Sequence, residues 1–78
     1  MTRSEFLAML DDILEQPAGT LVGNEELESL ENWDSLAIVS LIAQVHVETG
    51  HTLEAKAVKA CTNISQLLPM VEPLAKVG

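Results

Sequence analysis

Residues 33–50 read WDSLAIVSLIAQVHVETG and contain the longest apolar tract of this 78-residue chain, from Leu36 to Val47. Asp34 is placed to cap a helix, because its carboxylate can accept the unpaired amides of a first turn, and Gly50 suits the left-handed residue after a helix end. We therefore predict a helix over residues 35–49 that is apolar on nearly every side and largely buried. Its polar stripe comprises Ser40, Gln44 and Glu48, with Ala37 and Val47 beside it, while Val39, Ile42 and Val45 lie on or near the opposite side.

The segments before this helix predict another helix and a long loop. Apolar residues at helical spacing, with Asp11 among the acids between them, predict an amphipathic helix over about residues 3–16, which should stop before Pro17. Residues 17–34 are rich in proline, glycine and acids, and such a long connection is uncommon in a small domain unless it has a function. Four apolar side chains are expected to pin this loop onto the core: Leu21, Val22, Leu27 and Leu30.

The C-terminal third predicts one short helix and one last helix. The short helix covers about residues 54–60. The last helix starts at about residue 63, where Thr62 or Asn63 can cap it, and we expect it to be kinked or ended near Pro69. The predicted fold class is all-α: a single domain over residues 1–78, built as a small bundle of three main helices plus a short one.

Composition narrows the classes of function. Twelve acids and four bases give a net charge of −8, and 47% of the residues are hydrophobic. These values indicate a globular chain and argue against binding to nucleic-acid phosphates. The acids are concentrated in residues 1–50, which hold ten acids and one base, whereas residues 51–78 hold two acids and three bases. The negative electrostatic field of these acids suits the recruitment of basic partner proteins, or it simply keeps a small protein soluble.

Several kinds of site are not expected. Cys61 is the only cysteine, which excludes an internal disulfide, and we expect it to be a small buried apolar side chain. His46 and His51 do not share a helical face, so no metal site is predicted. The N-terminus does not resemble a signal peptide, and residues 36–47 fall short of the ~20 apolar residues of a membrane span. We expect a cytoplasmic protein without catalytic residues.

The residues most informative about function are Asp34, Ser35 and Leu36, where the acidic loop enters the apolar helix. Ser35 would lie in the first turn, so that no preceding turn covers its hydroxyl. Free amides at the positive end of a helix dipole also favour an anion there. Trp33 can pack on Ile38 as a hydrophobic staple. Asp-Ser-Leu alone is a weak tripeptide, because helix capping by itself favours Asp-Ser.

In its order of elements the whole chain resembles the acyl carrier proteins and the related peptidyl carriers: helix, long loop, Asp-Ser-Leu, helix, short helix, last helix. The resemblance implies a four-helix bundle of the acyl-carrier type, with 4'-phosphopantetheine attached covalently to Ser35 and with Asp34 and Leu36 as motif neighbours. It implies a discrete, non-enzymatic carrier that holds an acyl or aminoacyl group as a thioester. The implied partners of this monomer are a phosphopantetheinyl transferase, a ligase that loads the acyl or aminoacyl cargo, and a downstream transferase or synthase, with no nucleic acid and no membrane insertion.

The helix after the serine departs from the housekeeping carriers of fatty-acid synthesis, which are rich in acids there. In this chain Glu48 is the only acid of residues 35–49. We therefore expect a small, neutral and partly apolar docking face, and a dedicated carrier in a specialised pathway. The residues expected to dock partners are Trp33, Ala37, Ser40, Gln44, Val47 and Glu48.

The class of cargo depends on how deeply the bundle can shelter an acyl chain. Pro69 interrupts a regular last helix, so a short, polar or aminoacyl cargo is at least as consistent with the sequence as a long fatty chain. The alternative function is a non-enzymatic acidic interaction module without a prosthetic group, in which the apolar helix binds another protein and Ser35 only begins that helix.

Overall fold

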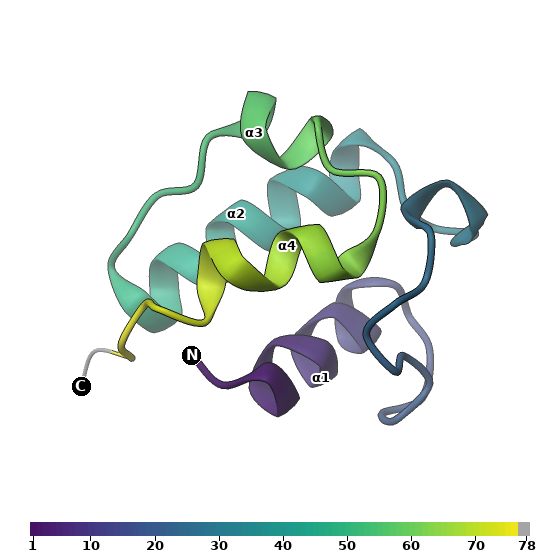
Figure 1. Cartoon of the computed structure of the whole chain (residues 1–78), viewed down its shortest axis with the longest axis horizontal. Coiled ribbons are helices and arrows are strands. Elements are labelled where there is room, and N and C mark those ends of the chain that lie inside the picture. The colour runs from purple at the N-terminus through teal and green to yellow at the C-terminus, as the bar shows by residue number, and fades with distance from the viewer. Residues whose placement is uncertain (77–78) are drawn as a thin grey trace.

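The computed structural model describes residues 1–76 as an all-α bundle (Figure 1); residues 77 and 78, which the predicted domain includes, lie outside the described residues. In Figure 1, α4 lies in front of α2, with α1 below them and α3 above. The elements are α1 Arg3–Ile13, the single 3-10 turn η1 Leu27–Ser29, α2 Ser35–Thr49, α3 Ala55–Lys59 and α4 Ile64–Val71. The predicted fold class, three main helices plus a short one with a long gap after the first, is confirmed.

The core lies where α1, α2 and α4 meet. Its residues recur at helical spacing on each element, so that each helix turns one face inward. These buried residues include Phe6, Leu10 and Leu14 from the α1 region, Ile38, Leu41 and Val45 from α2, Val58 from α3, and Ile64, Leu67, Leu68 and Val71 from α4. None of the helices within residues 1–76 combines the length and the apolar character that a membrane crossing needs.

Helix α1 ends at Ile13, so the predicted end at Gln16 is wrong by three residues. Glu15 has a left-handed backbone with φ of 59°. Around it, the Gln16 amide donates to the Asp11 carbonyl at 3.0 Å, and the Glu15 amide donates to the Asp12 carbonyl at 3.1 Å. This pair of bonds is a Schellman motif, which closes the helix before the next proline is reached.

A buried carboxylate holds the first half of the long connection. Asp11 is only 1% exposed. It accepts hydrogen bonds from Gln16 Nε2 at 2.9 Å, from the Gly19 amide at 3.0 Å and from the Leu21 amide at 3.2 Å. These bonds fold residues 16–21 back against α1. As one of the acids of an amphipathic helix, Asp11 was expected on the exposed face. It is buried instead, because residues 16–21 fold over it and donate hydrogen bonds to its carboxylate.

The second half of the connection pairs with the segment between α3 and α4. The Leu27 amide donates to the Thr62 carbonyl at 2.9 Å, and the Ile64 amide donates to the Glu25 carbonyl at 3.0 Å. Residues 25–27 and 62–64 thus form a short antiparallel bridge, and the Leu27 side chain is buried beneath it. The connection is therefore fixed at both of its halves.

Val22 is the exception among the apolar residues predicted to pin the loop. Leu21 and Leu27 are buried and Leu30 is partly buried, as predicted, but the Val22 side chain is 62% exposed. The Val22 carbonyl instead accepts from Arg3 Nη2 at 2.6 Å. The same guanidinium lies against Gly23, which has a φ of 112°, and a Cβ atom there would displace it.

Helix α4 continues through Pro69 and ends at Val71, two residues beyond the predicted kink or end. Proline lacks an amide donor and therefore cannot complete the hydrogen bond to the preceding turn. Pro69 is exposed. The helix closes just after it, where the Glu72 amide donates to the Leu68 carbonyl at 2.9 Å. At the other end Asn63 Oδ1 accepts from the Gln66 amide at 3.1 Å, which confirms Asn63 as the cap.

The C-terminal segment is tied to the start of the chain. The Met1 amino group donates to the Leu74 carbonyl. Lys76 Nζ lies 2.7 Å from Glu5 Oε2 and 3.5 Å from Glu48 Oε2. The hydrogen bond from Lys76, with further bonds from Thr2, lowers the pKa of Glu5 to about 2. This segment therefore joins the start of α1 to the end of α2.

Candidate functional site

Ser35 is the first residue of α2, and the residue before it caps the helix. Asp34 Oδ1 accepts from the Ala37 amide at 2.9 Å, and the Asp34 carbonyl accepts from the Ile38 amide at 3.1 Å. At the other end Gly50 is left-handed with φ of 76°, so both predicted boundaries of this helix are confirmed. The Ser35 side chain is exposed, as its place in the first turn predicts.

We expect the Asp34 cap to contribute measurably to stability. Asp34→Ala removes the acceptor of the Ala37 amide, so we expect the free energy of unfolding to fall by about 1 kcal/mol. Urea unfolding followed by circular dichroism measures this loss. Glu31→Ala, a change at an exposed acid of the same loop, is the control and should leave the midpoint unchanged. Equal midpoints for the two variants would contradict the cap.

The chain just before Ser35 is held against the end of α1. Asn32 Nδ2 donates to the Leu14 carbonyl at 2.7 Å, and the Trp33 amide donates to the Leu30 carbonyl at 3.2 Å. The Trp33 ring is half-buried and packs against the core cluster that contains Ile38. The position of Ser35 is therefore set by α1 and the core as well as by its own helix.

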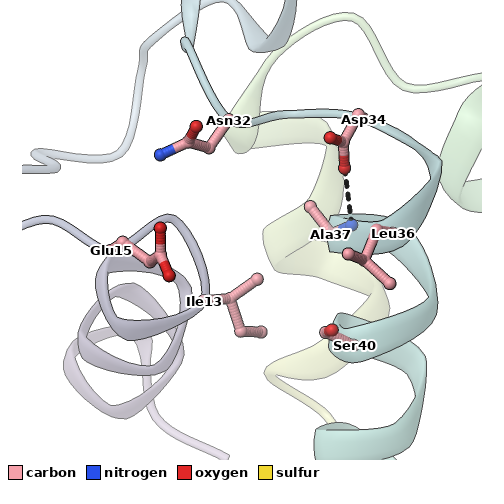
Figure 2. A pocket seen from close by; sticks show the side chains of 7 residues that line it. All are labelled: Ile13, Glu15, Asn32, Asp34, Leu36, Ala37 and Ser40. Atoms are coloured by element: carbon pink, nitrogen blue, oxygen red, sulfur yellow. Dashed lines mark hydrogen bonds between the residues drawn. The ribbon is translucent and has the colours of Figure 1, made fainter.

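A pocket of about 280 Å³ lies beside Ser35, between the end of α1 and the start of α2 (Figure 2). In Figure 2, Ile13, Glu15 and Asn32 approach it from one side, and Leu36 and Ser40 approach it from α2. Three apolar residues line it: Ile13, Leu36 and Ala37. Four polar residues complete it: Glu15, Asn32, Asp34 and Ser40. Sequence reasoning missed this pocket, because its walls come from two separate helices.

The outward face of α2 differs from the predicted one at two positions. Ala37, expected among the docking residues, is buried, whereas Val39, expected on the opposite side, is 61% exposed. The buried stripe follows Ile38, Leu41 and Val45 instead. In a helix that is apolar nearly all round, contact with α1 and α3 selects the inward face, and the sequence of α2 alone does not.

The remaining predicted docking residues differ in exposure. Gln44 is exposed, and Val47 is 71% exposed. Ser40 and Glu48 are partly exposed, and Glu48 faces Lys76. Together with Leu36, which is 72% exposed, Val39 and Val47 give α2 an outward stripe of apolar side chains. We call Leu36, Val39 and Val47 the apolar stripe.

Histidine and cysteine side chains outside this site lie apart from one another within residues 1–76. His46 and His51 are exposed, and His46 Nδ1 lies 3.2 Å from Thr52 Oγ1. Within residues 1–76 no group of three metal-ligating side chains is found. Cys61 is half-buried, less than predicted, and burial raises the pKa of its thiol. The Cys61 thiol is thereby less disposed to act as a nucleophile.

No family model, curated protein or solved structure matches the chain. The functional interpretation therefore rests on the geometry around Ser35 and on the order of the elements.

Proposed function

We propose that this chain is a discrete carrier protein that holds an acyl or aminoacyl group as a thioester on a 4'-phosphopantetheine arm attached to Ser35. It is not itself an enzyme, and it works as a cytoplasmic monomer that passes its cargo between the enzymes of a specialised biosynthetic pathway. The observation that carries the proposal is the exposed Ser35 hydroxyl at the capped N-terminus of α2, the longest helix.

The residues around Ser35 fit a phosphodiester. Asp34 caps the amide of Ala37, while the amides of Ser35 and Leu36, in the first turn, have no acceptor inside the helix. These amides stand at the positive end of the helix dipole, where an anion is stabilised. Ser35 and Leu36 would therefore hold the phosphate, and the exposed side of the site leaves room for an enzyme to reach the hydroxyl.

Attachment needs a phosphopantetheinyl transferase and coenzyme A. The Ser35 oxygen forms the new bond to phosphorus, the pyrophosphate bond of coenzyme A breaks, its nucleotide half leaves, and the serine proton passes to a base of the transferase. When attached, the arm supplies the thiol that carries the cargo. The chain itself contributes the position of that thiol and a surface on which partner enzymes dock.

The docking surface supports dedicated partners. Residues 35–47 contain no Asp, Glu, Lys or Arg, and the apolar stripe faces outward along them. A loading ligase and a downstream transferase or synthase would therefore meet α2 through apolar contacts, because this face offers little to a strongly basic surface.

The experiment that tests the proposal measures intact mass. Wild-type chain, incubated with coenzyme A and a broad-specificity phosphopantetheinyl transferase, should gain one phosphopantetheine. Ser35→Ala should gain none, and Ser4→Ala, a change to an exposed serine of α1, should gain the full mass. If several transferases modify a control carrier but not the wild-type chain, the proposal is wrong.

One observation favours a second candidate. The exposed side chains of the apolar stripe are also what an interaction module without a prosthetic group would present to another protein's helix. The same mass measurement separates the two functions, since an interaction module gains no phosphopantetheine.

A further inference from the structure

The pocket beside Ser35 has the size and the position of a site for a small group. At about 280 Å³ it lies just below the ~300–1,000 Å³ found for small-molecule sites. Asp34 and Leu36, which flank Ser35 in sequence, both line it. An arm attached to the Ser35 oxygen therefore starts beside this pocket, and a cargo on its thiol reaches the pocket when the arm folds back along the surface.

The side chains that line the pocket include two acids, Glu15 and Asp34, and no base. The chain has only four bases. Arg3 binds the Val22 carbonyl and Lys76 lies against Glu5 and Glu48, while Lys56 and Lys59 belong to α3.

The two carboxylates reach the pocket from different elements, Glu15 from the end of α1 and Asp34 from the residue that caps α2 (Figure 2). Glu15 occupies the left-handed turn that ends α1, and Asp34 is anchored by its bond to the Ala37 amide. Asn32, whose Nδ2 is bound to the Leu14 carbonyl, and Ser40 add polar groups between them. Ile13 and Ala37 supply apolar surface. This combination matches a ligand with an ammonium group next to a short hydrocarbon part.

We infer that this pocket binds the ammonium end of a small aminoacyl cargo carried on the arm at Ser35, with Glu15 as the residue that selects the charged cargo over a neutral acyl group. The inference rests on the proposed function and deepens it by naming the class of cargo. Asp34 contributes charge as well, but its part in the helix cap makes it unsuitable for the test.

The test compares two cargoes of nearly equal shape. Alanyl and isobutyryl groups differ in that an ammonium replaces a methyl, and both can be attached to Ser35 from coenzyme A analogues with an amide in place of the thioester. In ¹H–¹⁵N spectra of the loaded chains, the alanyl group should shift the amides of Glu15, Asn32 and Ala37 relative to the chain with an unacylated arm. The isobutyryl group should shift them several-fold less.

Variants assign the effect to Glu15. In Glu15→Gln the difference between alanyl and isobutyryl chains should fall at least several-fold, whereas Glu31→Gln, at an exposed acid outside the pocket, should keep it. Because the pocket is open to solvent, 0.5 M salt should also reduce the difference. Equal shifts for both cargoes, no shift for either, or a difference that persists in Glu15→Gln would each overturn the inference. None of these results touches the proposed function, which fails only if the arm cannot be attached.

Discussion

Asp11→Ala is expected to lower the free energy of unfolding by about 3 kcal/mol, the combined effect of leaving three donors without their acceptor. The donors are Gln16 Nε2 and the amides of Gly19 and Leu21, and the Leu21 bond is buried. For a domain of this size the loss corresponds to a drop of roughly 12–24 °C in melting temperature. Thermal unfolding followed by circular dichroism measures it.

The neighbouring acid is the matched control. Asp12 is exposed, so Asp12→Ala should change the melting temperature little. Asp11→Asn should fall between the two, because its amide keeps one acceptor oxygen but turns an NH₂ group toward one of the donors. A melting temperature of Asp11→Ala equal to that of Asp12→Ala would contradict this account.

Hydrogen exchange gives the prediction a second readout. The bonds to Asp11 hold the first half of the connection, whereas the second half is held by the bridge between residues 25–27 and 62–64. In Asp11→Ala the amides of Gly19 and Leu21 should lose protection first, at temperatures where α2 remains folded. Loss of protection at the same rate throughout the chain would indicate that the connection has no stability of its own.

Local sequence predicted α2 better than α1, for a physical reason. The ends of α2 are set by Asp34 and Gly50, two residue types whose preference for caps is intrinsic. The end of α1 is set by Glu15 in a left-handed turn, which a glutamate adopts at some cost. The bonds of Asp11 to residues farther along the chain hold the segment after that turn, and neither spacing nor propensity reveals them.

The candidate site likewise has one feature that local sequence predicts and one that it does not. The exposure of Ser35 follows from its position in the first turn, which the cap alone predicts. The pocket does not follow from local sequence, because Glu15 and Asn32 lie beside α2 only in the folded arrangement of α1, the connection and α2. The inward direction of α2 was misjudged at Ala37 and Val39 because an almost uniformly apolar helix takes its orientation from its neighbours.

The dependence of the site on the whole fold leads to the second large effect. Phe6 is completely buried and is the only phenylalanine of the chain. Phe6→Ala should cost about 3–5 kcal/mol, the range for truncating a buried aromatic ring. A domain of this length has roughly 4–12 kcal/mol of stability in total, at ~0.05–0.15 kcal/mol per residue. We therefore expect Phe6→Ala to be partly unfolded at 37 °C, whereas the exposed change Val39→Ala should leave the melting temperature nearly unchanged.

Phe6→Ala also tests whether the transferase needs the folded bundle in order to modify Ser35. If the transferase recognises the exposed hydroxyl on a capped helix held by α1 and the core, Phe6→Ala should be modified several-fold more slowly than the wild type at 37 °C, with the rate recovering on cooling below its melting temperature. Val39→Ala separates slow modification due to unfolding from slow modification due to a lost apolar contact on α2, since it keeps the fold. Full-rate modification of unfolded Phe6→Ala would mean that the residues adjoining Ser35 suffice for recognition, and that the bundle serves the later transfer of cargo instead.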